Sequence, residues 1–131
     1  NSVHYFANKH PNGIDLSGTV VLEYDDFICS LNGAKDSASA NFAQIQGEKG
    51  YIYINSASSM CTTVELHKGK EVETYTYQED MNALYYENID FKAIIESEDY
   101  EIRDDYLQES LKTIKVLEEA RKDAGIKFGN E

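Results

Sequence analysis

The feature that most constrains this chain is a helical pattern near its end, between Asp105 and Gly125. Apolar side chains recur there every three or four residues, at Leu107, Leu111, Ile114, Leu117, Ala120 and Ala124. This spacing places them on one face of a helix and the charged residues on the other. Asp105 stands where an N-cap is expected, and Gly125 where a left-handed C-cap is expected. The apolar face needs a partner, and because most of the upstream sequence favours strands, a helix lying across a sheet is predicted.

The upstream part of the chain alternates β-prone runs with turn residues. Strands are predicted at residues 2–8, 19–24, 27–32, 37–46, 51–54, 62–67 and 70–77. Asp25 and Asp26 separate two of these runs and predict a hairpin, and Lys68-Gly69 predicts another. The run Tyr51–Ile54 has four apolar residues in a row, which is typical of a strand covered on both sides.

From Asp80 the apolar period lengthens to that of a helix, which we expect to end near Ser97, with residues 98–103 as its connection to the last helix. Strands first and helices last predict an α+β fold. We expect residues 1–131 to form a single domain with a largely antiparallel mixed sheet. Two C-terminal helices would cover one face of that sheet. The other face would stay open for packing against a domain or subunit, because a large apolar face is rarely left in water.

Charge and composition exclude several classes of partner. The chain has 24 acidic and 12 basic residues and a net charge of −12, which argues against binding the phosphate backbone of a nucleic acid. No apolar run approaches the roughly 20 residues that span a bilayer, so no membrane partner is expected. Cys29 and Cys61 lie far apart and outside any C-x-x-C spacing, as in reduced cytoplasmic proteins.

The residues that could carry chemistry have simpler structural explanations. No glycine-rich phosphate loop is present, so no cofactor site is expected in this chain. The three histidines are isolated from other ligands, so no metal site is predicted, and the acidic pairs fit turns and helix starts, so no catalytic residue is assigned. The tyrosines favour packing or an interface over a ligand platform. The histidines are His4, His10 and His67; the acidic pairs are 25–26, 79–80 and 104–105; the tyrosines are Tyr51, Tyr53, Tyr75, Tyr77, Tyr85 and Tyr86.

Four segments resemble motifs of the C-terminal half of the Gfo/Idh/MocA oxidoreductases, in the same order and spacing. Residues 18–26, GTVVLEYDD, resemble that family's G-x-V-x-L-x-Y strand, and residues 43–50, AQIQGEKG, resemble its I-x-G-x-x-G hairpin. Residues 86–91, YENIDF, and residues 110–126, SLKTIKVLEEARKDAGI, resemble its E-x-x-x-F helix and its terminal helix. The match that these segments mark extends over nearly the whole chain. One departure is Asp123, where the family usually has a small serine.

The resemblance implies an NAD(P)-dependent oxidoreductase acting on a sugar, polyol or related hydroxyl or carbonyl compound. This chain would be its C-terminal domain, supplying a substrate-pocket wall and an oligomer interface. The Rossmann domain that binds NAD or NADP, with the catalytic segment, would precede Asn1, so the fragment itself is expected to bind no cofactor and to be inactive. Within the chain, the resemblance assigns substrate-facing positions to Ser37, Ser39 and Asn41.

The residues by themselves are also compatible with a second function. The chain could be a free-standing, non-catalytic dimerisation or ligand-binding domain that pairs through its sheet. Under either function we expect a homodimer or higher oligomer through the open sheet face, at Tyr51–Ile54. Under the first, the other partners are the protein's own Rossmann domain and a small-molecule substrate.

Overall fold

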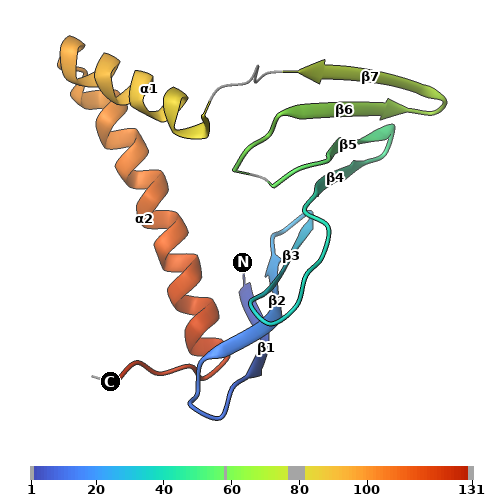
Figure 1. Ribbon diagram of the computed structural model, residues 1–131, viewed down its shortest axis with the longest axis vertical. Helices are drawn as coiled ribbons and strands as arrows, with labels where there is room; N and C mark the ends of the chain where they lie inside the picture. The colour runs from blue at the N-terminus through green and yellow to red at the C-terminus, as the bar shows by residue number, and fades with distance from the viewer. Residues whose placement is uncertain (1, 58, 77–81, 130–131) are drawn as a thin grey trace. The chain divides into compact units, whose positions relative to one another are not determined.

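The computed structural model describes residues 2–57, 59–76 and 82–129, and it confirms the α+β class (Figure 1). The strands are β1 (Ser2–Lys9), β2 (Asp15–Glu23), β3 (Ile28–Ala34), β4 (Ala43–Gly47), β5 (Gly50–Ile54), β6 (Thr63–Lys68) and β7 (Glu71–Thr76). The helices α1 (Ala83–Ser97) and α2 (Tyr100–Asp123) follow them. The chain divides into two compact units. The first contains β1–β3 and α2, and the second contains β4–β7 and α1.

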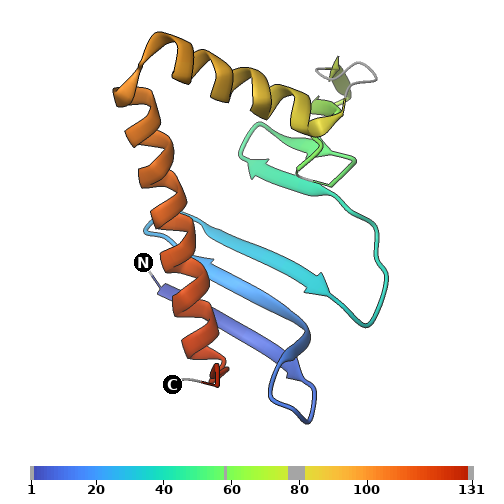
Figure 2. The ribbon, with the colours of Figure 1, turned by 60° about the vertical axis from the view of Figure 1, so that its left-hand side comes forward.

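The first unit is built on a three-stranded antiparallel sheet in the order β1-β2-β3 (Figure 2). Its β2–β3 hairpin turns at Asp25 and Asp26, as predicted. The N–H of Tyr24 donates to the carbonyl of Phe27 at 3.0 Å, and the two rings stack with centroids 4.3 Å apart. The turn is therefore closed by its flanking aromatic residues as well as by the backbone.

Helix α2 ends in the first unit with the predicted left-handed glycine. Gly125 has φ of +63° and its N–H donates to the carbonyl of Lys122, while the N–H of Ile126 donates to that of Arg121. These two bonds form a Schellman motif, which commonly brings the residue after the glycine against the last turn. Ile126 and Ala120 are the two buried apolar side chains among the described residues. The helix end is therefore the best-packed point of this unit.

The start of α2 differs from the sequence prediction. The helix begins at Tyr100, so Asp105 lies inside it and is not its N-cap, and residues 100–103 are helical instead of a connection. Helix α1 ends before Glu98, which has a left-handed φ of +54° and donates its N–H to the carbonyl of Ile94. Glu101 then lies in the first turn of α2, where its negative charge is favoured by the helix dipole.

Polar contacts fasten the end of α2 to β1, which is an edge strand of its sheet. A carboxylate oxygen of Asp123 accepts the backbone N–H of Tyr5 at 2.7 Å, and the other lies 3.6 Å from Nδ1 of His4. The Nζ of Lys9 donates to the carbonyl of Ala124. Asp123 thus supplies an acceptor for an edge N–H that has no neighbouring strand.

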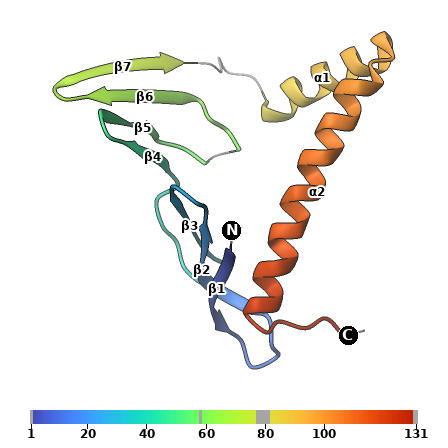
Figure 3. The ribbon, with the colours of Figure 1, turned by 180° about the vertical axis from the view of Figure 1, so that it is seen from behind.

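The second unit contains a four-stranded antiparallel sheet in the order β4-β5-β6-β7 (Figure 3). Directly paired residues share a face in such a sheet, so its two faces follow from the register. One face is mostly apolar and contains Ala43, Ile45, Ile52, Ile54, Val64, Leu66 and Tyr75. The other is aromatic and polar and contains Gln44, Gln46, Tyr51, Tyr53, Glu65 and His67. The run Tyr51–Ile54 therefore contributes two residues to each face.

The structure explains one of the two glycines in the I-x-G-x-x-G motif of the β4–β5 hairpin. A Cβ at Gly50 would collide with the backbone carbonyl of His67 on β6, whereas a Cβ at Gly47 would make an ordinary contact at 3.5 Å. Strand β6 therefore approaches β5 most closely at Gly50, where only a glycine fits without a backbone shift.

The structure has two sheets where the sequence pattern predicted one. The cause lies in residues 37–46, which were predicted to be one strand but form strand only from Ala43. Residues 37–41 alternate Ser, Ala, Ser, Ala and Asn, so they offer no apolar face that would hold them in a sheet. Within the first unit, α2 packs against β1.

Helix α1 begins in the second unit with an asparagine cap. The Oδ1 of Asn82 accepts the N–H of Leu84 at 3.0 Å, which satisfies one of the free amides at the helix start. The helix ends at Ser97, as predicted. The predicted start at Asp80 and Met81 lies outside the described residues. Within the part of the chain that the structure describes, neither helix combines the length and apolar content needed to cross a bilayer.

Candidate functional site

The three residues that the resemblance assigned to substrate lie in the exposed, non-strand segment between β3 and β4. Ser37 belongs to the first unit, and its Oγ donates to a carboxylate oxygen of Asp36 at 3.4 Å. Ser39 and Asn41 belong to the second unit. All three side chains are exposed, so each is accessible to a small polar molecule. Their role with a substrate stays a prediction.

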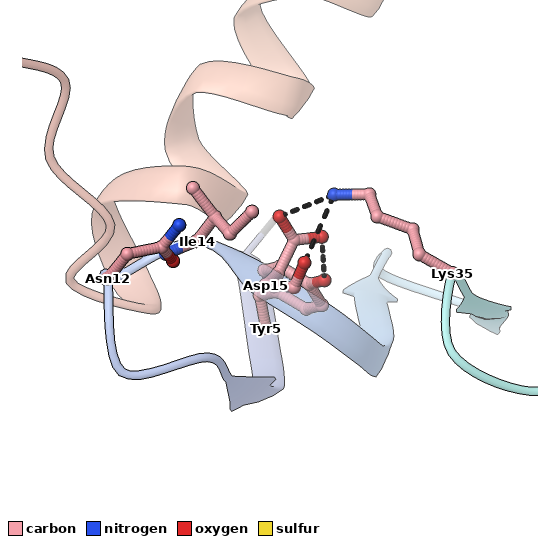
Figure 4. Close-up of polar contacts among 5 residues, drawn as sticks. All are labelled: Tyr5, Asn12, Ile14, Asp15 and Lys35. Carbon is pink, nitrogen blue, oxygen red and sulfur yellow. Dashed lines mark hydrogen bonds and ion pairs between the residues drawn. The ribbon is translucent and has the colours of Figure 1, made fainter.

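A polar cluster that sequence reasoning missed lies in the first unit, beside the start of this segment (Figure 4). The hydroxyl of Tyr5 donates to Oδ2 of Asp15 at 2.9 Å, and Nζ of Lys35 lies 2.8 Å from Oδ1. Nζ of Lys35 also donates to the backbone carbonyl of Asp15 at 3.2 Å. The side chain of Asp15 is 30% exposed and that of Lys35 is 63% exposed. The cluster thus has a half-buried anion with a donor on each carboxylate oxygen.

Glycine at position 18 allows Tyr5 to reach Asp15. Tyr5 is on β1, and a Cβ at Gly18 on β2 would lie 2.5 Å from a carbon of the Tyr5 ring and 2.6 Å from the carbonyl oxygen of Phe6. Both contacts are far shorter than van der Waals distance. The first residue of the G-x-V-x-L-x-Y motif is therefore small because the tyrosine ring crosses it.

The pKa shifts in the cluster favour a structural role for Asp15 over a role as general acid or base. The hydrogen bond from Lys35, followed by that from Tyr5, lowers the pKa of Asp15 below its ordinary 3.8. Burial, followed by the hydrogen bond to Asp15, raises the pKa of Tyr5 above 10.0. At neutral pH Asp15 is thus an anion with both oxygens engaged, and Tyr5 keeps its proton as a donor. Neither group is poised for proton transfer near pH 7.

A second cluster lies on the aromatic and polar face of the second unit. The rings of Tyr51 and His67 stack with centroids 4.3 Å apart and an interplanar angle of 8°. Nε2 of His67 lies 2.7 Å from a carboxylate oxygen of Glu65, two residues earlier on β6. An open depression of about 450 Å³ lies at the β4–β5 hairpin, and its lining includes Ile45, Ile52 and Leu66 of the apolar face and Tyr51 of the other. The strand register places the tyrosines of β5 and the apolar residues of β4–β6 on opposite faces of the sheet.

The remaining candidate residues have local partners. His4 lies between Glu23 and Asp123, at 3.9 and 3.6 Å, and Nδ1 of His10 accepts the N–H of Asn12. Over residues 2–57, 59–76 and 82–129, no three histidine, cysteine or carboxylate side chains are grouped as metal ligands would be. Cys29 and Cys61 are free thiols and half-buried.

Two known oxidoreductases are similar to this chain over most of its length. No family model matches the chain. It is 33% identical over 117 residues, 89% of its length, to scyllo-inositol 2-dehydrogenase (NADP(+)) IolU of Bacillus subtilis. It is 29% identical over 127 residues, 97% of its length, to the uncharacterized oxidoreductase YgjR of Escherichia coli.

Both proteins are similar to this chain over most of its length, in agreement with its resemblance to the C-terminal half of the Gfo/Idh/MocA oxidoreductases. It spans little more than a third of the length of these two relatives, 36% of IolU and 38% of YgjR. The resemblance read from the four sequence motifs is thereby confirmed. Both relatives are oxidoreductases by name.

Proposed function

We propose that the intact protein containing this chain is an NAD(P)-dependent oxidoreductase that acts on a polyol, a sugar or a related hydroxyl or carbonyl compound. One observation carries the proposal: the chain aligns over 89% of its length with a dehydrogenase of an inositol that uses NADP(+). The reaction would move hydride between the nicotinamide and a carbon that bears the hydroxyl or carbonyl group.

In this proposal the chain is the C-terminal domain for substrate binding and assembly, and the nicotinamide binds a Rossmann domain elsewhere in the protein. Tyr5 and Asp15 support this division, because the cluster that they form is built to stay in one protonation state at neutral pH. The chain by itself would be inactive. The intact enzyme would work in the cytoplasm, where Cys29 and Cys61 stay reduced.

We assign the substrate-facing role to Ser37, Ser39 and Asn41. Hydroxyl and amide groups both donate and accept hydrogen bonds, which suits the hydroxyl groups of a neutral polyol. The exposure of the three side chains supports the assignment, because no described hydrogen bond of the chain occupies Ser39 or Asn41. Replacing Asn41 with Ala should raise the KM for polyol and leave the KM for nicotinamide unchanged.

We also propose that two copies of the protein associate through the sheet of the second unit, along the run Tyr51–Ile54. The apolar face beside β5 supports this, since Ile45 on the neighbouring strand β4 is 62% exposed. Charge substitution at Ile52 or Ile54, such as Ile52→Glu, should convert the oligomer to monomer in sedimentation velocity. A matched substitution on the other unit, Val21→Glu, should leave the oligomer intact. A wild-type monomer at high concentration would contradict the interface.

The decisive experiment uses the intact gene product. Purified protein is mixed with NADP+ or NAD+ and, in turn, scyllo-inositol, other inositols and aldoses, and nicotinamide reduction is followed at 340 nm. We expect turnover with at least one cyclic polyol or sugar, and none from residues 1–131 alone. Intact protein that binds no nicotinamide would overturn the proposal and favour a non-catalytic dimerisation or ligand-binding domain.

A further inference from the structure

The polar cluster of the first unit lies directly before one of the residues assigned to substrate. Lys35 follows the last residue of β3, and Ser37 is two residues further along the same unit. Lys35 is held at two places, because its side chain bonds Asp15 and its own N–H donates to the carbonyl of Leu16 at 2.7 Å. Both hydrogen-bonding partners, Asp15 and Leu16, are the first two residues of β2.

Asp15, the residue that bonds Lys35, is itself held by a contact from β1. Asp15 is paired with Lys9 at the irregular end of the β1–β2 ladder, so regular strand pairing alone holds it weakly. The hydroxyl of Tyr5 reaches it across Gly18 and occupies the oxygen that Lys35 leaves open. The three side chains therefore form a chain of contacts from β1 through β2 to the end of β3.

We propose that Tyr5, Asp15 and Lys35 form a clamp that positions Ser37 for the polyol or sugar. The clamp takes the place of strand pairing, which stops at Ala34 in β3 and resumes only at Ala43 in β4. Without it, Ser37 would lie on an exposed segment that carries only a weak bond to its neighbour Asp36. These are positioning residues, because none of them needs to touch the substrate. The inference rests on the proposed function.

Lys35→Met is the first test, in the intact oxidoreductase. Methionine keeps the length of the side chain and removes the charge. Displacement of a substrate-binding residue by about 1 Å can cost up to 100-fold, so we expect the KM for polyol to rise about 5- to 20-fold. The KM for nicotinamide should stay within about twofold of wild type. Lys35→Arg, which can still pair with Asp15, should restore most of the affinity for polyol.

The matched control is Lys112→Met on α2. Lys112 forms an exposed ion pair with Glu109 at 2.6 Å, in the same unit but away from the clamp. This variant should leave both KM values unchanged. A double variant, Lys35→Met with Asp15→Asn, should be no worse than the more damaged single variant, because contacting residues in one network are not additive.

Hydrogen exchange separates this inference from the proposed function. The amide of residue 35, which donates to the carbonyl of Leu16, should exchange several-fold faster in Lys35→Met than in the wild-type chain, and Lys112→Met should match wild type. If the intact protein oxidises no polyol or sugar, the proposed function fails while the exchange result still tests the clamp. If the enzyme is active and Lys35→Met leaves both the polyol KM and the exchange unchanged, the clamp is overturned and the function stands.

Discussion

The two units of this chain are held together in different ways. In the first, residues far apart in sequence meet at the end of α2, where Asp123 bonds β1 and Ile126 is buried. In the second, the prominent contacts join neighbouring strands of one meander, and the hydrogen-bonded pair Glu65 and His67 is two residues apart. The first unit therefore adds a few long-range contacts to its strand ladder, whereas the second relies on its ladder alone among the contacts described. Substitutions should reveal this difference, and the expected effects can be ranked.

Gly50→Ala should have the largest effect, because the second unit depends on the strand ladder. The new Cβ would collide with the carbonyl of His67, so β6 must move away from β5. We expect a loss of about 3 kcal/mol in the free energy of unfolding, measured with urea. Gly47→Ala, in the same hairpin but with an ordinary 3.5 Å contact, should cost about 1 kcal/mol or less. Equal effects of the two variants would contradict the close approach at Gly50.

Gly18→Ala tests the first unit in the same way. Its Cβ would meet the Tyr5 ring and the carbonyl of Phe6, but the ring can rotate away, so we expect a loss of about 2 kcal/mol. Gly33 pairs with Gly18 in the register and has open space around it. Gly33→Ala should therefore change the free energy of unfolding by no more than about 0.5 kcal/mol. Similar losses from both glycines would mean that Tyr5 does not cross β2.

Asp123→Ala removes the acceptor for the edge N–H of Tyr5. The side chain of Asp123 is 40% exposed, so water replaces part of the lost bond, and we expect a loss of about 1 kcal/mol. Amides of β1 should exchange faster, while those of β5 and β6 stay at the wild-type rate. Glu119→Ala, which removes a carboxylate 4.0 Å from Lys115 on the same helix, should change the free energy of unfolding by less than about 0.5 kcal/mol. Faster exchange in both units would contradict the division between them.

The smallest effect is a dependence on pH below about 4. The pKa of Asp15 is lowered in the folded protein, so its contribution to stability is present above the unfolded value of 3.8 and is lost as pH falls through the folded value. In Asp15→Asn this part of the pH profile should flatten, while stability at pH 7 decreases slightly. Urea unfolding between pH 2 and pH 7 measures both. An unchanged slope below pH 4 would show that Lys35 and Tyr5 do not stabilise the anion.

Much of the fold could be predicted because its signals are local. The Asp25-Asp26 hairpin, the end of α1 at Ser97 and the glycine cap of α2 each depend on a few neighbouring residues. The start of α2 was missed because residues 98–103 carry no Gly or Pro, and the break between the helices depends on one glutamate with positive φ. The strand predicted at 37–46 was too long because its alternation of small residues resembles a strand and buries nothing.

The candidate site was less predictable. Ser37, Ser39 and Asn41 came from a family resemblance, and no spacing in the sequence marks them. Tyr5, Asp15 and Lys35 are separated by 10 and 20 residues and match no motif. Only Gly18 gave a signal, because a glycine within a strand often marks a close approach of another group. In the structure that group is the ring of Tyr5, which the register of β1 on β2 places over Gly18.

The sequence by itself determined the α+β class, the order of strands before helices, the marked C-terminal end of α2 and the resemblance to the Gfo/Idh/MocA oxidoreductases. Each of these follows from residue periodicity, turn chemistry or motif order along the chain. Only the tertiary structure decided that Asp15 receives Tyr5 and Lys35, that Asp123 bonds an edge strand, and that His67 lies beside Tyr51. These contacts depend on strand register and on which distant segments of the chain meet in the fold. No local sequence pattern encodes the distance between side chains on different strands.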